Sequence, residues 1–196
     1  MKAISSLSQD YKEICSVDLQ KNKKTAVFVN LLALIIAAIL VVPMAFFVPL
    51  DTLFSFEKGM GVYFAKFGIL LVGIIVYMVL HELVHGIAMK ICGTKKIKYG
   101  FTGMYAFAGS EDYYNKKAYL FIALAPVVLW GVVLAIVTPF ISYEWFWVVY
   151  FIQVNNLSGA AGDLFVTVKF SKLPKDILIK DYGVGMTVYS ASCIND

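Results

Sequence analysis

The chain has 196 residues, of which 60% are hydrophobic. A soluble domain of this length is closer to half apolar, so the composition indicates a membrane protein with one compact domain over residues 1–196. The formal net charge is only +4, and the sequence has no basic stripe with interleaved aromatic residues. These features exclude nucleic acid as the expected partner.

Four apolar segments follow a polar stretch at the N-terminus. Each has at least the roughly 20 residues that a helix needs to cross the hydrocarbon core. The first segment begins too late and runs too long for a cleaved signal peptide. The predicted fold is therefore an all-α membrane protein with four transmembrane helices. These helices are predicted at about residues 25–48, 62–91, 118–140 and 145–168.

Lysine placement predicts how these spans are oriented. All seventeen basic residues are lysines, and most lie before the first span, between the second and third spans, or in the tail of residues 169–196. Because cytoplasmic segments are enriched in lysine, we expect a multi-pass protein of the cell membrane with both termini in the cytosol. The lysines would face anionic headgroups of the lipid bilayer. The tail is predicted to be a short cytosolic extension.

The three cysteines carry little information about a site. Cys15, Cys92 and Cys193 all fall on the predicted cytosolic side. Their spacing indicates neither a disulfide framework nor a metal site.

The second span contains the sequence HELVH, in which His81, Glu82 and His85 form an H-E-x-x-H pattern. Positions i and i+4 share one face of a helix, so the two imidazoles can bind one zinc ion. Glu82 would then act as general base toward the water on that ion. His81 and His85 are the only histidines in the chain, and both have metal-binding spacing. The alternative is that these polar groups serve contacts between helices.

The fourth span supplies a third candidate ligand, Asp163. Counted from the cytosolic end of their spans, His85 and Asp163 both lie about 10 Å deep at 1.5 Å per residue. The alternative for Asp163 is a charge at a helix end near the headgroups. Glu111, with Asp112 beside it, is the competing ligand. It lies in a polar loop flanked by lysines and would have to fold about 10 Å back into the membrane.

Two further polar residues of the fourth span, Asn155 and Asn156, are predicted to be catalytic. Their amides could donate hydrogen bonds to a substrate carbonyl or a developing oxyanion. They could equally form hydrogen bonds between helices.

The loop between the second and third spans contains IKYGF and MYAFAG, separated by Thr102 and Gly103. Both stretches are rich in β-branched or aromatic residues, which predicts a short β-hairpin near the cytosolic face. An edge strand of this hairpin could hold an extended peptide by strand addition. The alternative is an amphipathic loop that rests on the headgroups.

An H-E-x-x-H pattern in the membrane, followed by an Asn-rich segment that ends in aspartate, resembles the site-2 protease class of intramembrane zinc metalloproteases. Asn155 and Asp163 have the eight-residue separation of that class. Ser158, Gly162 and Leu164 stand where that class has proline, leucine and glycine.

Over most of its length, the chain is similar to a family of small bacterial zincin-type membrane peptidases, classed as a domain of unknown function. The similar stretches are HELVHG, NNLSGAAGDL and KLPKDILIKDYGVGMTVY. The resemblance implies a zinc site of His81, His85 and Asp163, with Glu82 as general base. It implies no particular substrate.

We therefore expect a zinc-dependent, membrane-embedded endopeptidase that cleaves a peptide or membrane-protein substrate near the cytosolic face. Histidine and carboxylate ligands also suit iron or cobalt. The rival hypothesis is a non-catalytic metal-binding, scaffold or immunity-type membrane protein with a relict site. Activity that depends on Glu82 would distinguish the two.

Overall fold

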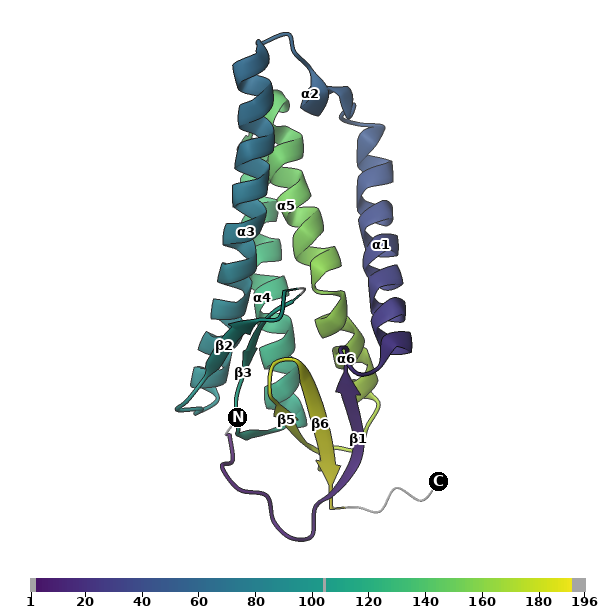
Figure 1. Cartoon of the computed structure of the whole chain (residues 1–196), viewed down its shortest axis with the longest axis vertical. Helices are drawn as coiled ribbons and strands as arrows, with labels where there is room; N and C mark the ends of the chain where they lie inside the picture. The colour runs from purple at the N-terminus through teal and green to yellow at the C-terminus, as the bar shows by residue number, and fades with distance from the viewer. Residues whose placement is uncertain (1–2, 104, 192–196) are drawn as a thin grey trace. The chain divides into compact units, whose positions relative to one another are not determined.

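The computed structural model describes residues 3–103 and 105–191. Met104, in the second predicted strand, and Cys193 lie outside the described residues. The helices are α1 (Lys23–Ala45), α2 (Asp51–Phe54), α3 (Met60–Ile91), α4 (Lys116–Val137), α5 (Phe146–Gly159) and α6 (Ala161–Ser171) (Figure 1). Two short 3-10 helices, η1 (Thr138–Phe140) and η2 (Tyr143–Trp145), precede α5. The strands are β1 (Lys12–Asp18), β2 (Lys98–Phe101), β3 (Ala106–Gly109), β4 (Tyr113–Asn115), β5 (Leu178–Asp181) and β6 (Gly185–Ser190).

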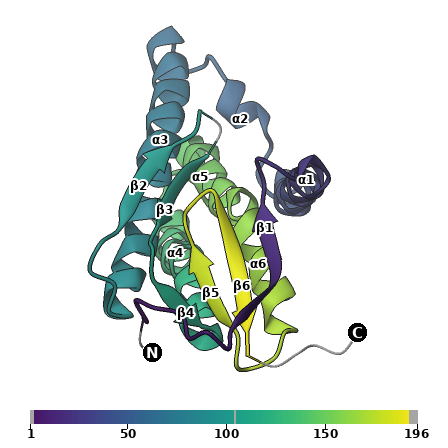
Figure 2. The same ribbon diagram turned by 60° about the horizontal axis from the view of Figure 1, so that its bottom comes forward.

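The predicted all-α fold is wrong, because the chain forms two β-sheets. The expected hairpin is present as the antiparallel pair β2 and β3. The second sheet has four strands in the order β1-β6-β5-β4 (Figure 2). It combines the N-terminal stretch, the loop before α4 and the tail, so the tail is not a simple extension. The strands are short, and the β1–β6 and β4–β5 pairs join segments far apart in the sequence, so the local pattern gave little sign of this sheet.

Within this sheet, β5 and β6 form a hairpin in which Leu178 pairs with Tyr189 and Asp181 with Met186. The connecting turn contains Gly183 with a φ of 96°, a conformation that side chains disfavour. The Asp181 Oδ1 atom accepts a 2.9 Å hydrogen bond from the Gly183 N–H group. A carboxylate that bonds to the backbone two residues on stabilises such a turn.

The prediction of four continuous membrane spans is also wrong. Among the described residues, three helices are long and apolar enough to cross a membrane: α1, α3, and α4 extended through η1. The fourth predicted span is divided at Ala160 into α5 and α6. At 1.5 Å per residue, the 14 residues of α5 extend only about 21 Å. This is shorter than the roughly 30 Å hydrocarbon core.

The chain divides into two compact units. The first contains the described residues up to Val29, the range Glu82–Pro126, and the described residues from Gly162 onward. The second contains Asn30–His81 and Val127–Ala161. The boundary therefore passes through α3, between the first histidine and the glutamate of the H-E-x-x-H pattern. A single membrane-embedded metallopeptidase domain stays a prediction.

The core of the first unit joins the end of α3, the first half of α4, α6 and the four-stranded sheet. Its fully or almost fully buried members include Met89, Ile122, Phe170, Ile179 and Val188. Each of these elements contributes apolar side chains to one cluster, so the burial of apolar area holds them together. The last turns of α3 and the first turns of α6 are thus held within one packed unit.

The second unit has a smaller core around Trp147, which is fully buried. The Trp147 indole N–H group donates a 3.1 Å hydrogen bond to the Pro49 carbonyl. Lys66 on α3 is also buried, with its ammonium group 2.9 Å from the Thr52 carbonyl and 3.6 Å from a Glu144 carboxylate oxygen. A buried lysine needs such partners. The two contacts of Lys66 therefore hold α2 and η2 against α3.

Phe170→Ala should test the core of the first unit. The Phe170 ring is fully buried and lies 5.5 Å from the Tyr119 ring, between centroids. We expect its loss to lower the free energy of unfolding by about 3–5 kcal/mol. Phe101→Ala is the matched control in the same unit, because Phe101 is 62% exposed, and it should change stability by about 0.5 kcal/mol or less. Denaturant unfolding in detergent micelles measures both, and equal losses would contradict this core.

Candidate metal centre

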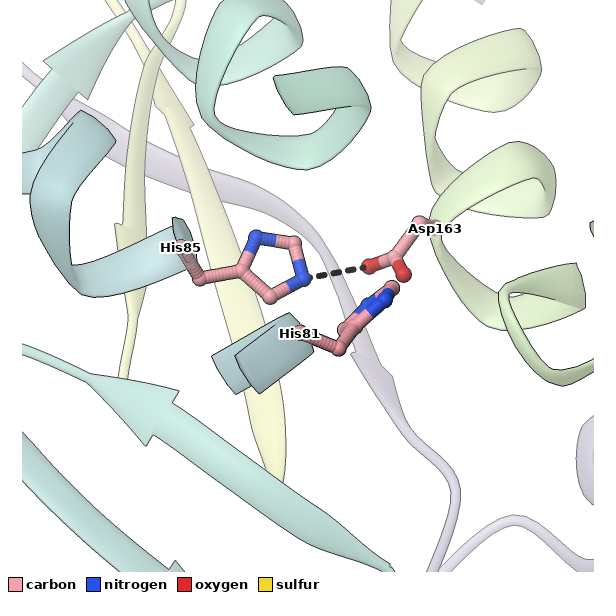
Figure 3. Close-up of side chains that lie close together, drawn as sticks. All are labelled: His81, His85 and Asp163. Atoms are coloured by element: carbon pink, nitrogen blue, oxygen red, sulfur yellow. Dashed lines mark ion pairs between the residues drawn. The ribbon is translucent and has the colours of Figure 1, made fainter. Parts of the chain in front are cut away.

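His81 and His85 lie one turn apart near the end of α3, as the H-E-x-x-H spacing predicts. Both histidines are 8% exposed and therefore buried. Asp163 lies in the first turn of α6 and is partly buried. Each of the three residues offers one ligand atom, and these atoms lie within 4.8 Å of one another (Figure 3). The structure thus brings together the three residues predicted as metal ligands.

In this cluster, His85 Nε2 lies 3.6 Å from Asp163 Oδ1 (Figure 3). Two ligand atoms bound tetrahedrally to one zinc at 2.0–2.2 Å are about 3.4 Å apart. The observed distance is therefore close to the one that a shared metal ion requires. Without a metal, a protonated His85 would form an ion pair with the carboxylate.

The other ring nitrogen of His85 is held by the backbone of α4. His85 Nδ1 lies 2.9 Å from the Ile122 carbonyl oxygen. A carbonyl only accepts, so Nδ1 must carry a proton, and in the neutral ring Nε2 then carries the lone pair. This is the tautomer that a ligand to zinc through Nε2 requires.

The Ile122 carbonyl is available because of Pro126, which lies inside α4 four residues later. In a regular helix, the N–H group of residue 126 would donate to the carbonyl of residue 122. Proline has no N–H group, so that helical bond is absent. The His85 ring takes the place of the missing donor, which gives the proline a role in orienting a ligand.

His81 is held through its Nδ1 atom as well, by a residue one turn earlier on α3. The Tyr77 hydroxyl oxygen lies 2.8 Å from His81 Nδ1. The same hydroxyl donates a 2.7 Å hydrogen bond to Asn156 Oδ1. All of these side chains are buried, so their hydrogen bonds form in apolar surroundings where an unmade bond is costly.

The donor set fits zinc. Two imidazoles and one carboxylate form a common set of three protein ligands in catalytic zinc sites, where a fourth position is left for water or substrate. Both imidazoles have an Nδ1 contact to a protein group, as metal-binding histidines usually do. His81, His85 and Asp163 would hold the ion.

Other groups surround this cluster in the first unit. Glu82 is partly buried and close enough to affect the charge on His85. Asp181, at the end of β5, is near the same groups. Burial raises its pKa to about 6, the His85 charge opposes this shift, and Asp163 and Glu82 add to it. The hairpin also contacts this helix, because a Cβ atom on Gly86 would collide with the Tyr99 hydroxyl of β2.

Glu111, the competing ligand, is not in the cluster. Its two carboxylate oxygens lie 2.7 Å from the ammonium groups of Lys98 and Lys180. Hydrogen bonds from Lys180 and Lys98 lower the Glu111 pKa to about 2. Both oxygens therefore already have cationic partners at the protein surface.

The two asparagines predicted as catalytic differ in their surroundings. Asn156 is fully buried, and its amide contacts Tyr77 and the Val127 carbonyl. Asn155 is half-buried, with its amide beside Gly159. Contact with a substrate stays a prediction for both.

Sequence reasoning missed Tyr77, Ile122 and Pro126. Tyr77 could have been found, because it extends the His81–His85 row by one more step of four residues. Ile122 acts through its carbonyl, which the side-chain pattern does not report. Pro126 acts by leaving that carbonyl without its helical donor, and the approach of His85 to it is specified only by the tertiary structure.

Comparison with known proteins identifies the class to which this fold and site belong. A family model described as "Putative zincin peptidase" matches residues 74–178, which is more than half of the chain. The protein belongs to this family, and the matched region includes the three clustered residues and Glu82. The predicted resemblance to zincin-type peptidases is confirmed, whereas the likeness to site-2 proteases stays a prediction.

One curated relative is an uncharacterized 24.7 kDa protein of Pyrococcus woesei. It is 29% identical over 122 residues, which cover 60% of this chain and 53% of the relative. The matched part thus spans about half the length of that protein. No solved structure matches the chain significantly.

Pro126→Ala should separate helix stability from metal binding. Alanine at this position supplies an N–H group that competes with His85 Nδ1 for the Ile122 carbonyl. We expect zinc affinity to fall about tenfold, while stability of the metal-free protein is unchanged or higher, since proline is a poor helix former. Chelator competition and thermal unfolding measure the two effects.

Pro43→Ala is the matched control, because Pro43 is likewise inside a long helix, α1. It should leave zinc affinity unchanged. Equal zinc affinities in the two variants would contradict the role of Pro126.

Asp163→Asn should weaken zinc binding by about tenfold or more, because it removes the one anionic ligand of the cluster. Glu111→Gln and Asp112→Asn should leave zinc affinity nearly unchanged, although Glu111→Gln also removes a charged surface carboxylate. Isothermal titration of metal-free protein with zinc measures all three. A larger loss in Glu111→Gln than in Asp163→Asn would reverse the ligand assignment.

Proposed function

We propose that the protein is a zinc-dependent, membrane-embedded endopeptidase that cleaves a peptide or membrane-protein substrate near the cytosolic face. The observation that carries this proposal is the cluster of His81, His85 and Asp163. Glu82 lies next to His81 in the sequence, inside the region that matches the zincin peptidase family. Membership of a zincin peptidase family favours zinc over the iron or cobalt that such ligands also accept.

In this proposal the chain's own residues hold and move protons around the reacting peptide bond. When bound, zinc lowers the pKa of a water molecule to about 7 and polarises a carbonyl. Glu82 accepts a proton from the attacking water and later gives it to the leaving amine. The Nδ1 contacts of His81 and His85 keep the ligand nitrogens oriented.

The membrane location is supported by apolar surface on the long helices. Exposed side chains on α1 and α3 include Leu34, Ile39, Leu71 and Ile75. Contiguous exposed apolar residues on a helix of more than 20 residues suit contact with lipid tails. We therefore propose that α1, α3 and α4 cross the bilayer.

Strand pairing supports termini on the same side. The β1 strand pairs with β6, and β4 pairs with β5, so the N-terminal stretch, the loop before α4 and the tail share one sheet. The chain must then cross an even number of times between any two of these segments. The chain must also return to this side between α4 and β5. The many lysines on these segments favour the cytosolic side.

The substrate would be presented in extended form, as the cleavage of a peptide bond requires access to its carbonyl. The β2 strand pairs only with β3 among the described strands. Its remaining edge could accept a substrate strand, and its residue Tyr99 packs against α3 at Gly86, next to His85.

Glu82→Gln tests the proposal. The amide cannot accept the water's proton, so we expect proteolysis to be lost while about one zinc per chain is retained. Membrane proteomes of cells that carry the wild type or Glu82→Gln identify substrates by their accumulation. Glu111→Gln, which changes a carboxylate outside the cluster, should leave turnover unchanged.

Unchanged turnover of such a substrate in Glu82→Gln would contradict this mechanism. Identical proteomes in the two strains would favour the non-catalytic, relict-site hypothesis instead.

A further inference from the structure

Asn156 and Tyr77 form a directed chain of hydrogen bonds that ends on His81. All three residues lie in the second unit, and Asn156 is fully buried. The amide of Asn156 is joined to the Tyr77 hydroxyl at 2.7 Å, and that hydroxyl to His81 Nδ1 at 2.8 Å. A buried amide among apolar helices is costly unless its groups are hydrogen-bonded.

The backbone of α4 determines which group donates and which accepts in each of these hydrogen bonds. Asn156 Nδ2 lies 3.2 Å from the Val127 carbonyl oxygen. A carbonyl only accepts, so the NH₂ group must face Val127 and Oδ1 must face Tyr77. The amide orientation therefore follows from its surroundings.

The orientation of the Asn156 amide in turn determines the roles of the Tyr77 hydroxyl and of His81 Nδ1. A hydroxyl has one proton to donate, and Tyr77 donates it to Asn156 Oδ1. Toward His81 the hydroxyl oxygen can then only accept, so His81 Nδ1 carries a proton. In a neutral imidazole, Nε2 is consequently the nitrogen with the lone pair.

We propose that Asn156 and Tyr77 are positioning residues that set the tautomer of His81 and so present its Nε2 atom as a metal ligand. This proposal rests on the metal site of the proposed function. It differs from the predicted contact of Asn156 with a substrate. It requires that the asparagine act on the metal through two hydrogen bonds and not through direct contact.

The proposal predicts different consequences for removing each residue. Without Asn156, the Tyr77 hydroxyl can turn its proton toward His81 Nδ1, which would move the ring proton to Nε2, the wrong atom for binding. Without the Tyr77 hydroxyl, neither tautomer is imposed. Asn156→Leu should therefore weaken zinc binding more than Tyr77→Phe does, each by about tenfold or more.

The double variant provides the sharpest test. Tyr77→Phe in the Asn156→Leu background removes the misdirected hydroxyl, so zinc affinity should rise relative to Asn156→Leu alone. A purely structural role predicts that the second substitution lowers affinity further or leaves it unchanged.

The tautomer can be measured directly in the metal-free, full-length protein. The chain has two histidines, so ¹⁵N-histidine labelling gives four ring-nitrogen signals in detergent micelles. At a pH where imidazole is neutral, wild-type His81 should show a protonated Nδ1 and an unprotonated Nε2. Asn156→Leu should reverse this pattern, and Tyr77→Phe should give a mixture. The His85 signals, with Nδ1 on the Ile122 carbonyl, should not change and serve as a reference.

Tyr150→Phe is the matched control. Its hydroxyl also donates to another helix of the same unit, at 3.0 Å to the Leu40 carbonyl. Loss of that bond should lower the thermal unfolding midpoint about as much as Tyr77→Phe does, but leave the His81 tautomer and zinc affinity unchanged. If Asn156→Leu does not fold, Tyr77→Phe and Tyr150→Phe still give this comparison.

The same His81 tautomer in Tyr77→Phe, Tyr150→Phe and the wild type would overturn the proposal. This outcome is independent of the proposed function, because the measurement needs neither zinc nor a substrate. A protein that fails to bind zinc but shows the expected tautomers would refute the metal function and leave the hydrogen-bond chain intact.

Discussion

A histidine that binds a metal through one nitrogen must donate a hydrogen bond from its other nitrogen. An apolar helix bundle has few acceptors for that bond. Regular helices use nearly all of their carbonyls internally. The chain meets this requirement in two ways. His85 uses the Ile122 carbonyl, which Pro126 leaves without its helical donor. His81 uses the Tyr77 hydroxyl, whose own proton is taken by Asn156.

Interruptions of helix geometry recur around this cluster. Pro126 removes one backbone bond in α4, and the break at Ala160 ends α5 and begins α6. Because of that break, Asp163 lies in the first turn of a helix and not in the middle of one. The positive end of the helix dipole favours a carboxylate there. The division that removes the predicted fourth span therefore also places the third candidate ligand at the positive end of a helix.

The sequence predicted what depends on local spacing. His81 and His85 lie one helical turn apart, and Asp163 was selected because its depth in the membrane would match theirs. The sheet could not be predicted in this way, since β1 pairs with β6 from the other end of the chain. Short strands with distant partners leave no periodic signal that fixes their pairing. The role of Pro126 depends on the approach of the His85 side chain to the Ile122 carbonyl, and only the tertiary structure specifies that approach.

The tail has a structural part in the candidate site, although the sequence suggested no role for it. Lys116, at the start of α4, donates hydrogen bonds to the Ser171 and Leu173 carbonyls at the end of α6. The chain then enters β5, which pairs with β4 just before α4. Both ends of this connection are thus tied to the helix whose Ile122 carbonyl holds His85. Because Asp163 is carried by α6 within the same packed unit, its distance from His85 depends on the pairing of the tail. A metal site whose ligands come from separate helices requires such a brace, because a displacement of about 1 Å at a ligand is enough to impair it.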